Sequence, residues 1–141
     1  YKDFAHAPSK LRATIAAMRE QYPDRRLVAC MELHTYSSLT QEFLAQYRGT
    51  MEGADVACVY FSRHALALKK LPPLDPDQVA RAFDPQGRTS AEGGRIEVFT
   101  DSHALTVRLG QIDWHNANLL MMSSGNFDGI DTARLADTLL K

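Results

Sequence analysis

Residues 26–38 read RLVACMELHTYSS, and this stretch decides the fold. An unbroken apolar run at 27–31 leads directly into glutamate, histidine, threonine, tyrosine and serine. Short continuous apolar runs are typical of strands buried on both faces of a parallel sheet. The stretch therefore predicts a buried strand that ends in a polar segment at one edge of a sheet.

The same apolar pattern recurs at 56–61, 96–99 and 119–122. Between these runs, apolar residues at helical spacing predict helices at 9–21, after Ser38, around 79–83, at 102–111 and at 132–140. Alternating strands and helices indicate an α/β fold, a three-layer, mostly parallel, Rossmann-like sheet with helices on both faces. In such folds, ligands bind at the carboxyl ends of the strands.

The composition fits one domain and excludes several classes of partner. The chain has 141 residues, 45% of them hydrophobic, a formal net charge of -1 and a pI near 6.6. Without a basic surface field, we expect no binding to nucleic acid or to a membrane. Cys30 and Cys58 lie in apolar runs and are interpreted as buried free thiols of a cytoplasmic protein.

The amino-terminal residues suggest a fragment. The chain starts at Tyr1 and runs straight into YKDFAHAP, a segment whose extended flank we expect further upstream. The stretch at 71–94 is rich in proline and glycine and is interpreted as a decorated connection within the domain.

Polar residues gather in the segments that leave a strand and enter a helix, at 3–8, 32–38, 62–64 and 123–127. The polar residues of these segments also have purely structural interpretations. Asp3 also suits a turn, Ser37 and Ser38 suit helix N-caps, and His6 suits a structural role. The small residues at 123–126 would let backbone amides approach a phosphate or carboxylate.

Common catalytic motifs are missing from the sequence. It contains no GxxxxGK[ST], GxSxG, GxGxxG or HExxH pattern, so we expect no catalytic residues within this domain alone. We also expect no metal site, although His6, His34 and His64 could meet as ligands. Two alternatives stay open: a hydrolase that uses His6, His34 and Asp3, and a stand-alone flavodoxin-like or receiver-like module that binds a small ligand.

Four stretches resemble the carboxy-terminal domain of the Mur ligases, which build and recycle the peptide of peptidoglycan precursors. The most specific is DFAHAP at 3–8, which is similar to the D-[YF]-[AG]-H-x-P stretch of that family. The others are YPDRRLVA at 22–29, ELHTYSS at 32–38 and MSSGNFDGI at 122–130. Together they span nearly the whole chain.

Within the family, the SSGNF ending and Glu32 are closer to the murein peptide ligases than to the alanine-adding enzymes. The alanine-adding enzymes usually carry arginines where Thr35 and Ser38 stand. The murein peptide ligases usually have Pro-Arg where Leu33 and His34 stand, so the alanine-adding branch remains the alternative.

The resemblance implies a three-domain, ATP-dependent ligase. It would join UDP-N-acetylmuramate to L-alanyl-γ-D-glutamyl-meso-diaminopimelate through an acyl phosphate. A central domain outside this sequence would bind most of the ATP and Mg²⁺, and the present domain would close over both substrates. The partners are then the two substrates and the missing amino-terminal and central domains, and the domain alone is expected to be inactive.

The resemblance also assigns site residues. Asp3 would bind the nucleotide ribose, because a carboxylate accepts two hydrogen bonds from a diol, and His6 would line the same entrance. The side chains expected to bind the incoming peptide are His34, Thr35, Ser37, Ser123, Ser124 and Asn126, with Phe127 against its aliphatic part. These assignments require Asp3, His34 and Ser124 to lie close together at one edge of the sheet.

Overall fold

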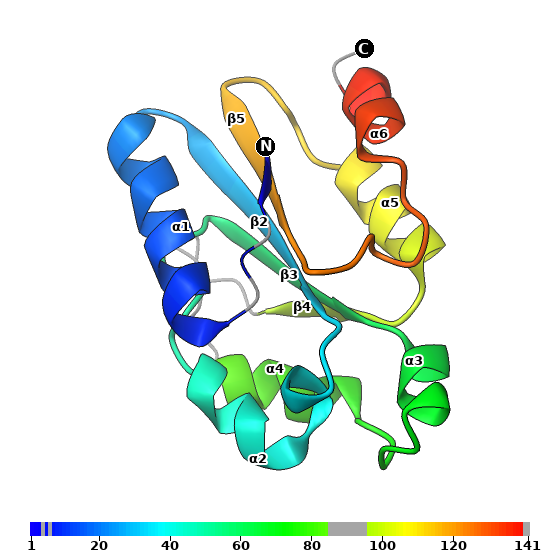
Figure 1. Cartoon of the computed structure of the whole chain (residues 1–141). Coiled ribbons are helices and arrows are strands. Elements are labelled where there is room, and N and C mark those ends of the chain that lie inside the picture. Colours follow the sequence, from blue (N-terminus) through cyan, green and yellow to red (C-terminus); the bar gives the residue numbers. More distant parts are fainter. Residues whose placement is uncertain (4, 6, 85–95, 140–141) are drawn as a thin grey trace.

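A computed structural model describes residues 1–3, 5, 7–84 and 96–139. Within these residues the strands form one sheet in the order β1-β5-β2-β3-β4, and each neighbouring pair is parallel (Figure 1). Their bounds are β1 (Lys2–Asp3), β2 (Arg26–Leu33), β3 (Val56–Phe61), β4 (Glu97–Phe99) and β5 (Ala117–Met122). The α/β class and the parallel, Rossmann-like sheet are confirmed.

Helices cover both faces of the sheet (Figure 1). The α-helices are α1 (Pro8–Gln21), α2 (Gln41–Leu44), α3 (Arg63–Leu68), α4 (Pro76–Phe83), α5 (Ser102–Gly110) and α6 (Thr132–Leu139). Short 3-10 helices, η1 (Ser37–Leu39) and η2 (Ala45–Tyr47), flank α2. One core cluster joins the sheet to α1, α2 and α4, and the second joins it to α5 and α6. No helix of the described residues is long and apolar enough to cross a bilayer.

The central strand β2 divides its side chains between these two cores. Ala29 and Met31 belong to the core under α1, whereas Val28 and Cys30 belong to the core under α5 and α6. Successive side chains of a strand point to opposite faces, so Glu32 falls on the same face as Cys30. A carboxylate therefore occupies an interior position at the end of the strand.

The segment after β2 differs from the sequence prediction. A single helix capped by Ser37 or Ser38 was expected, but η1 begins at Ser37 after Tyr36, and no side chain caps it. Instead the Ser38 amide donates to the Thr35 hydroxyl oxygen at 3.2 Å, and α2 begins only at Gln41. Thr35 forms a local side-chain turn that competes with a regular helix start, which is why the predicted cap is wrong.

Other elements match more closely. Strand β3 has the predicted bounds, while β2 and β5 are each longer than the apolar run that predicted them. Helix α4 occupies part of the connection predicted at 71–94, and residues 85–95 of that connection lie outside the described residues.

Candidate functional site at the carboxyl ends of the strands

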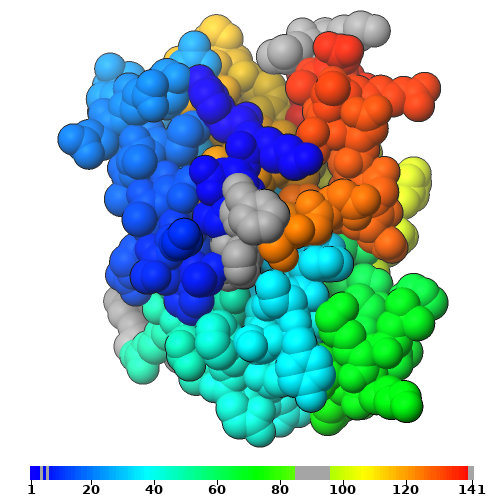
Figure 2. Space-filling view, in the orientation of Figure 1, coloured from blue at the N-terminus to red at the C-terminus, as the bar shows by residue number. Residues whose placement is uncertain are grey.

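The parallel register brings three segments to one edge of the sheet. Met122 of β5 lies opposite Asp3 of β1 on one side and Met31 of β2 on the other. Immediately beyond, the Ser123 amide donates to the Asp3 carbonyl at 3.1 Å. Figure 2 shows the blue amino-terminal segment, the cyan segment after β2 and the orange segment after β5 on one face. We call this edge, formed by residues 3, 32–37 and 123–129, the rim.

Glu32 organises the rim from inside. Its side chain is buried, with 2% of the residue exposed. One oxygen, Oε1, accepts hydrogen bonds from the Ser123 hydroxyl at 2.5 Å and from the Phe127 amide at 2.9 Å. The other, Oε2, lies 3.7 Å from Nδ1 of His34. Hydrogen bonds to an ionised acceptor are stronger than neutral ones, so Glu32 ties the 123–129 loop to β2.

Sequence reasoning did not assign Glu32 to the site. The available signal was a lone carboxylate directly after a five-residue apolar run, in a strand predicted to be buried on both faces. A buried carboxylate needs donors around it, and those donors come from a loop 91 residues further along the chain.

The loop that Glu32 holds has an unusual backbone. Phe127, Asp128 and Gly129 have consecutive positive φ angles of 54°, 57° and 93°. Non-glycine residues rarely occupy this region, and such conformations persist where the surroundings fix them. The Glu32 carboxylate fixes Phe127 through its amide, and the amides of Gly129 and Ile130 donate to the Asn126 carbonyl. The loop is therefore held at both ends.

Gly125 allows the loop to approach β2 closely. A Cβ atom at this position would lie 3.0 Å from Oε1 of Glu32 and 3.0 Å from the His34 ring. Any side chain would push the loop away from both groups. The glycine in the SSGN stretch thus permits close contact within the protein, where the sequence suggested close contact with a ligand.

Ser124 lies beside this contact. Its Oγ atom is enclosed, and among the described residues it has no hydrogen-bond partner. A buried hydroxyl is normally satisfied by protein or water, so Ser124 keeps an unused hydrogen-bonding capacity at this edge of the sheet. The next polar side chain, Asn126, is exposed.

The segment after β2 supplies further exposed groups. His34 has 43% of its side chain exposed, and Tyr36 and Ser37 are also exposed. Thr35 uses its hydroxyl oxygen to accept from the Ser38 amide. His34 and Ser37 are therefore the predicted residues of this segment whose side chains face outward.

Asp3 joins the rim through its backbone and bends the chain with its side chain. Its Oδ1 atom accepts from the Ala5 amide at 2.7 Å, which is the turn interpretation offered by the sequence. The residue is exposed, and its second carboxylate oxygen, Oδ2, is not needed for that turn. His6 lies outside the described residues. It belongs to both alternative histidine sites, the metal site and the hydrolase site.

Two residues predicted to bind the peptide have buried side chains. The Ser123 hydroxyl donates to Glu32 and accepts from the Gly125 amide at 2.7 Å, and Ser123 is 5% exposed. Phe127 is 2% exposed, and its ring packs on Tyr60 with a centroid distance of 6.1 Å. Both side chains point into the protein, because the loop needs an interior anchor, so neither presents a surface to a peptide.

Tyr60 of β3 lies beneath the loop. Its hydroxyl donates to Oδ2 of Asp128 at 3.4 Å. Burial, together with the negative charges of Asp128 and Glu32, raises the pKa of Tyr60 to about 12. The neutral phenol is therefore strongly favoured in the folded protein.

No group of three histidine, cysteine, aspartate or glutamate side chains within 1–3, 5, 7–84 and 96–139 could hold a metal ion. The rim thus offers hydroxyl, amide, imidazole and carboxylate groups around an enclosed serine oxygen. These groups can bind a polar or anionic ligand. They include no activated nucleophile.

No protein-family model matches the sequence. Curated proteins do match. The chain is 33% identical over 106 residues to a UDP-N-acetylmuramate–L-alanine ligase of Chlorobium phaeovibrioides, covering 73% of the chain and 21% of that protein. It is 49% identical over 55 residues to the corresponding ligase of Lactobacillus delbrueckii subsp. bulgaricus, covering 39% of the chain and 12% of that protein. The chain therefore spans between about an eighth and a fifth of the length of these relatives.

Solved structures share the fold over nearly the whole chain. A murein peptide ligase from Psychrobacter arcticus aligns over 96% of the chain and 26% of its own length, with a TM-score of 0.69 and 21% identity. A domain from a putative UDP-N-acetylmuramate:L-alanyl-γ-D-glutamyl-meso-diaminopimelate ligase of Haemophilus ducreyi aligns over 98% of the chain and 89% of its own, with a TM-score of 0.60 and 24% identity.

The fold and the rim define a parallel α/β domain with polar side chains gathered at the carboxyl ends of its strands. The comparisons in sequence and in structure then identify the chain as a Mur ligase C-terminal-like domain.

Replacing Glu32 by alanine tests the internal anchor. The change leaves the Ser123 hydroxyl and the Phe127 amide without their acceptor, so we expect a loss of about 2 to 3 kcal/mol in the free energy of unfolding. Glu32→Gln keeps an acceptor oxygen and should lose less than half as much. Urea unfolding measures both, with exposed Glu20→Ala as the control that changes by less than about 0.5 kcal/mol. Equal losses in the alanine and glutamine variants would contradict this role.

The pKa of Tyr60 predicts a loss of stability at alkaline pH. Its pKa of about 12 in the folded protein exceeds the ordinary 10.0, so its contribution is complete below pH 10 and is lost as the pH rises towards 12. Tyr60→Phe should flatten the decline of the unfolding free energy between pH 10 and 11.5, whereas exposed Tyr36→Phe should not. Denaturant titrations across this range measure both slopes. Identical slopes would argue against the assignment.

Proposed function

We propose that the intact protein is an ATP-dependent ligase that joins UDP-N-acetylmuramate to L-alanyl-γ-D-glutamyl-meso-diaminopimelate, with this domain presenting the rim to the peptide. The observation that carries the proposal is the enclosed, unpaired Ser124 hydroxyl beside exposed His34. The fold of a murein peptide ligase over 96% of the chain supports it.

The peptide carries several carboxylates, which suits the hydrogen-bond donors of the rim. The Ser124 and Ser37 hydroxyls and the Asn126 side chain can donate hydrogen bonds to carboxylate oxygens, and His34 can do so through its ring nitrogen. Glu32 acts indirectly, because it holds Ser123 and Phe127 and thereby sets the position of Ser124. Binding to a preformed rim avoids the cost of ordering the loop in each cycle.

The described residues of this domain suit one part of ATP, the ribose, but offer no site for Mg²⁺. Asp3 offers one carboxylate oxygen beyond its turn, which suits a ribose hydroxyl, but the described residues hold no cluster for a metal ion. We assign the phosphates and Mg²⁺ to the central domain of the intact protein, with ATP supplying the activation of the muramoyl carboxylate. Closure of the domain would exclude water and bring the peptide amine to the reacting carbon. We place this reaction in the cytoplasm.

A second candidate is the ligase that adds L-alanine to UDP-N-acetylmuramate. The curated relatives that match the sequence carry this activity in their names. Against it, Thr35 and Ser38 stand where arginines are usual in that branch, so the rim is less positive than the branch pattern implies.

The choice of substrate separates the two candidates. The intact protein, supplied with ATP, Mg²⁺ and UDP-N-acetylmuramate, should form the tripeptide product and little L-alanine product, as measured by mass spectrometry. The isolated 141-residue chain should form neither, because it lacks the phosphate site. Product from L-alanine alone would reject the tripeptide assignment in favour of the second candidate, and no product from either would reject both.

Ser124→Ala tests the rim in the intact enzyme. Removing one hydrogen bond to the peptide should raise the KM for tripeptide about 5- to 10-fold and leave the KM for ATP nearly unchanged, since a hydrogen bond contributes about 1 kcal/mol. Steady-state kinetics measure both constants. Ser9→Ala, an exposed serine on α1, is the matched control. A larger effect on the KM for ATP would remove Ser124 from the peptide site.

A further inference from the structure

The carboxylate of Glu32 and the imidazole of His34 form a pair at the rim. Oε2 of Glu32 lies 3.7 Å from Nδ1 of His34, and no other described residue bonds to that oxygen. The pair has a buried end and an open end, since the Glu32 side chain is 3% exposed and that of His34 is 43% exposed. A buried carboxylate behind an accessible imidazole is an arrangement that can move a proton.

The surroundings hold the His34 ring with one nitrogen inward. Nδ1 faces Glu32, and a Cβ atom at Gly125 would lie 3.0 Å from Cγ and from Cδ2 of the ring. The 3.7 Å separation is longer than a hydrogen bond, but catalytic pairs are often long before substrate binds. A carboxylate beside Nδ1 favours the tautomer protonated there, which leaves Nε2 as a proton acceptor.

The other titratable groups of the rim are acids or phenols. They are Glu32, Asp3 and Asp128, with the phenols of Tyr36 and, beneath the loop, of Tyr60. Arg63 and His64, at the start of α3, are basic groups that follow the neighbouring strand β3. No lysine or arginine occurs among residues 3, 32–37 and 123–129. The Glu32 side of the rim therefore favours a cation, such as the ammonium group of a peptide.

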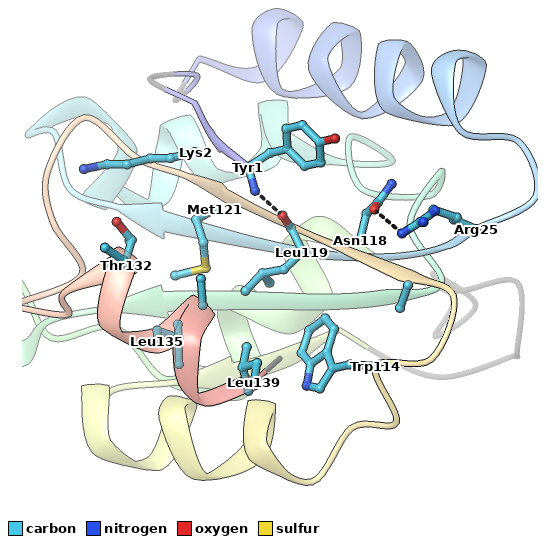
Figure 3. A pocket seen from close by; sticks show the side chains of 13 residues that line it. Tyr1, Lys2, Arg25, Trp114, Asn118, Leu119, Met121, Thr132, Leu135 and Leu139 are labelled. Carbon is cyan, nitrogen blue, oxygen red and sulfur yellow. Dashed lines mark hydrogen bonds between the residues drawn. The ribbon is translucent and has the colours of Figure 1, made fainter. Parts of the chain in front are cut away.

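The apolar pocket beside α6 does not suit that ammonium group. This pocket has a volume of about 420 Å³ and lies beside the stretch of β5 that β1 leaves unpaired. Figure 3 shows it surrounded by Leu119, Met121, Leu135 and Leu139. Among its described lining residues, the charged side chains are those of Lys2 and Arg25, which are both cations. The amine of the peptide is therefore better placed at the rim, over the pair of Glu32 and His34.

We propose that His34 is the general base that accepts a proton from the amine of the incoming peptide, and that Glu32 positions His34 for this step. The proposal rests on the proposed function, which supplies the peptide and the acyl phosphate. It adds a catalytic residue to a domain in which the sequence predicted none. An α-amino group is mostly protonated at neutral pH and then has no electron pair for attack. A base at the place where the amine binds removes this barrier.

One proton moves to His34 and a second to the leaving phosphate. An N–H bond of the ammonium group breaks, its proton goes to Nε2 of His34, and the electron pair stays on nitrogen. The freed amine forms a bond to the acyl carbon, and the bond from that carbon to the phosphate oxygen breaks. The nitrogen loses its second proton to the phosphate, which leaves as hydrogen phosphate, and His34 then releases its proton to solvent. Until then, the charge of Glu32 stabilises the cationic ring.

His34→Gln in the intact enzyme tests the base. Glutamine keeps a polar side chain but cannot take up a proton. At pH 7, kcat for the tripeptide should fall about 100-fold with little change in its KM, which is the size of effect that a general base gives. The loss should shrink to about 10-fold or less at pH 9, where an α-amino group is largely unprotonated in solution. Steady-state kinetics from pH 6 to 9 measure both constants.

Exposed His115→Gln, just before β5 at the opposite end of the strands, is the matched control and should keep the activity of the unchanged enzyme. An unchanged kcat with a raised KM in His34→Gln would overturn the proposal, because His34 would then only bind the peptide. A loss of kcat that is the same at every pH would overturn it too.

Glu32→Gln tests the positioning role. It retains an acceptor for Ser123 and Phe127 but removes the charge beside His34. We expect kcat to fall at least about 10-fold at pH 7, again with recovery at pH 9. Adding Glu32→Gln to His34→Gln should cause little further loss, because both act on one step. A loss that fully adds to that of His34→Gln, or that does not change with pH, would reject the positioning role.

Hydroxylamine separates these results from the proposed function, because it is an uncharged amine at neutral pH and attacks acyl phosphates without a base. With ATP, Mg²⁺ and UDP-N-acetylmuramate, the intact protein and its His34→Gln variant should form the hydroxamate at similar rates. Absence of both hydroxamate and tripeptide product in the unchanged protein would reject the proposed function. Hydroxamate formation together with tripeptide ligation that is insensitive to His34→Gln would keep the function and reject the base.

Discussion

The buried Glu32 carboxylate is the constraint on which the rim depends. It lies at an interior position of the central strand, where an unpaired charge would cost several kcal/mol. Its donors, the Ser123 hydroxyl and the Phe127 amide, come from the loop after the neighbouring strand. That loop includes successive residues with positive φ, a conformation that needs support from the rest of the protein. The carboxylate and the loop therefore stabilise each other.

This arrangement separates support from binding within one short loop. Ser123 and Phe127 turn inward, where one bonds to Glu32 and the other packs on Tyr60. Ser124 and Asn126 lie between them; the Ser124 hydroxyl has no hydrogen-bond partner among the described residues, whereas Asn126 accepts hydrogen bonds from the Gly129 and Ile130 amides within the loop. A loop anchored at two interior positions can hold the residues between them in a defined position, which favours selectivity for a ligand with several polar groups. The rim is therefore a preformed polar surface at the carboxyl ends of the strands.

The chain also has two surfaces with different chemistry. The rim is polar and lies where parallel strands end, as expected for ligand binding in open α/β sheets. The pocket beside α6 is lined mainly by apolar side chains and follows a partly unpaired strand edge. An unpaired strand edge leaves backbone N–H and C=O groups available for pairing. Both surfaces border β1 and β5.

The sequence by itself determined the class of fold, because apolar runs such as 56–61 have few structural alternatives when helical patterns alternate with them. It also placed Asp3, His34 and Ser124 at strand ends, and the parallel register brings their segments together. The sequence did not determine which polar side chains face outward. The inward turn of Ser123 and Phe127, the role of Glu32 and the replacement of a helix cap by Thr35 all depend on partners distant in the chain or on competing local bonds. Only the tertiary structure decided these points, because a side chain's direction at a loop is set by what it packs against, and no local pattern encodes that contact.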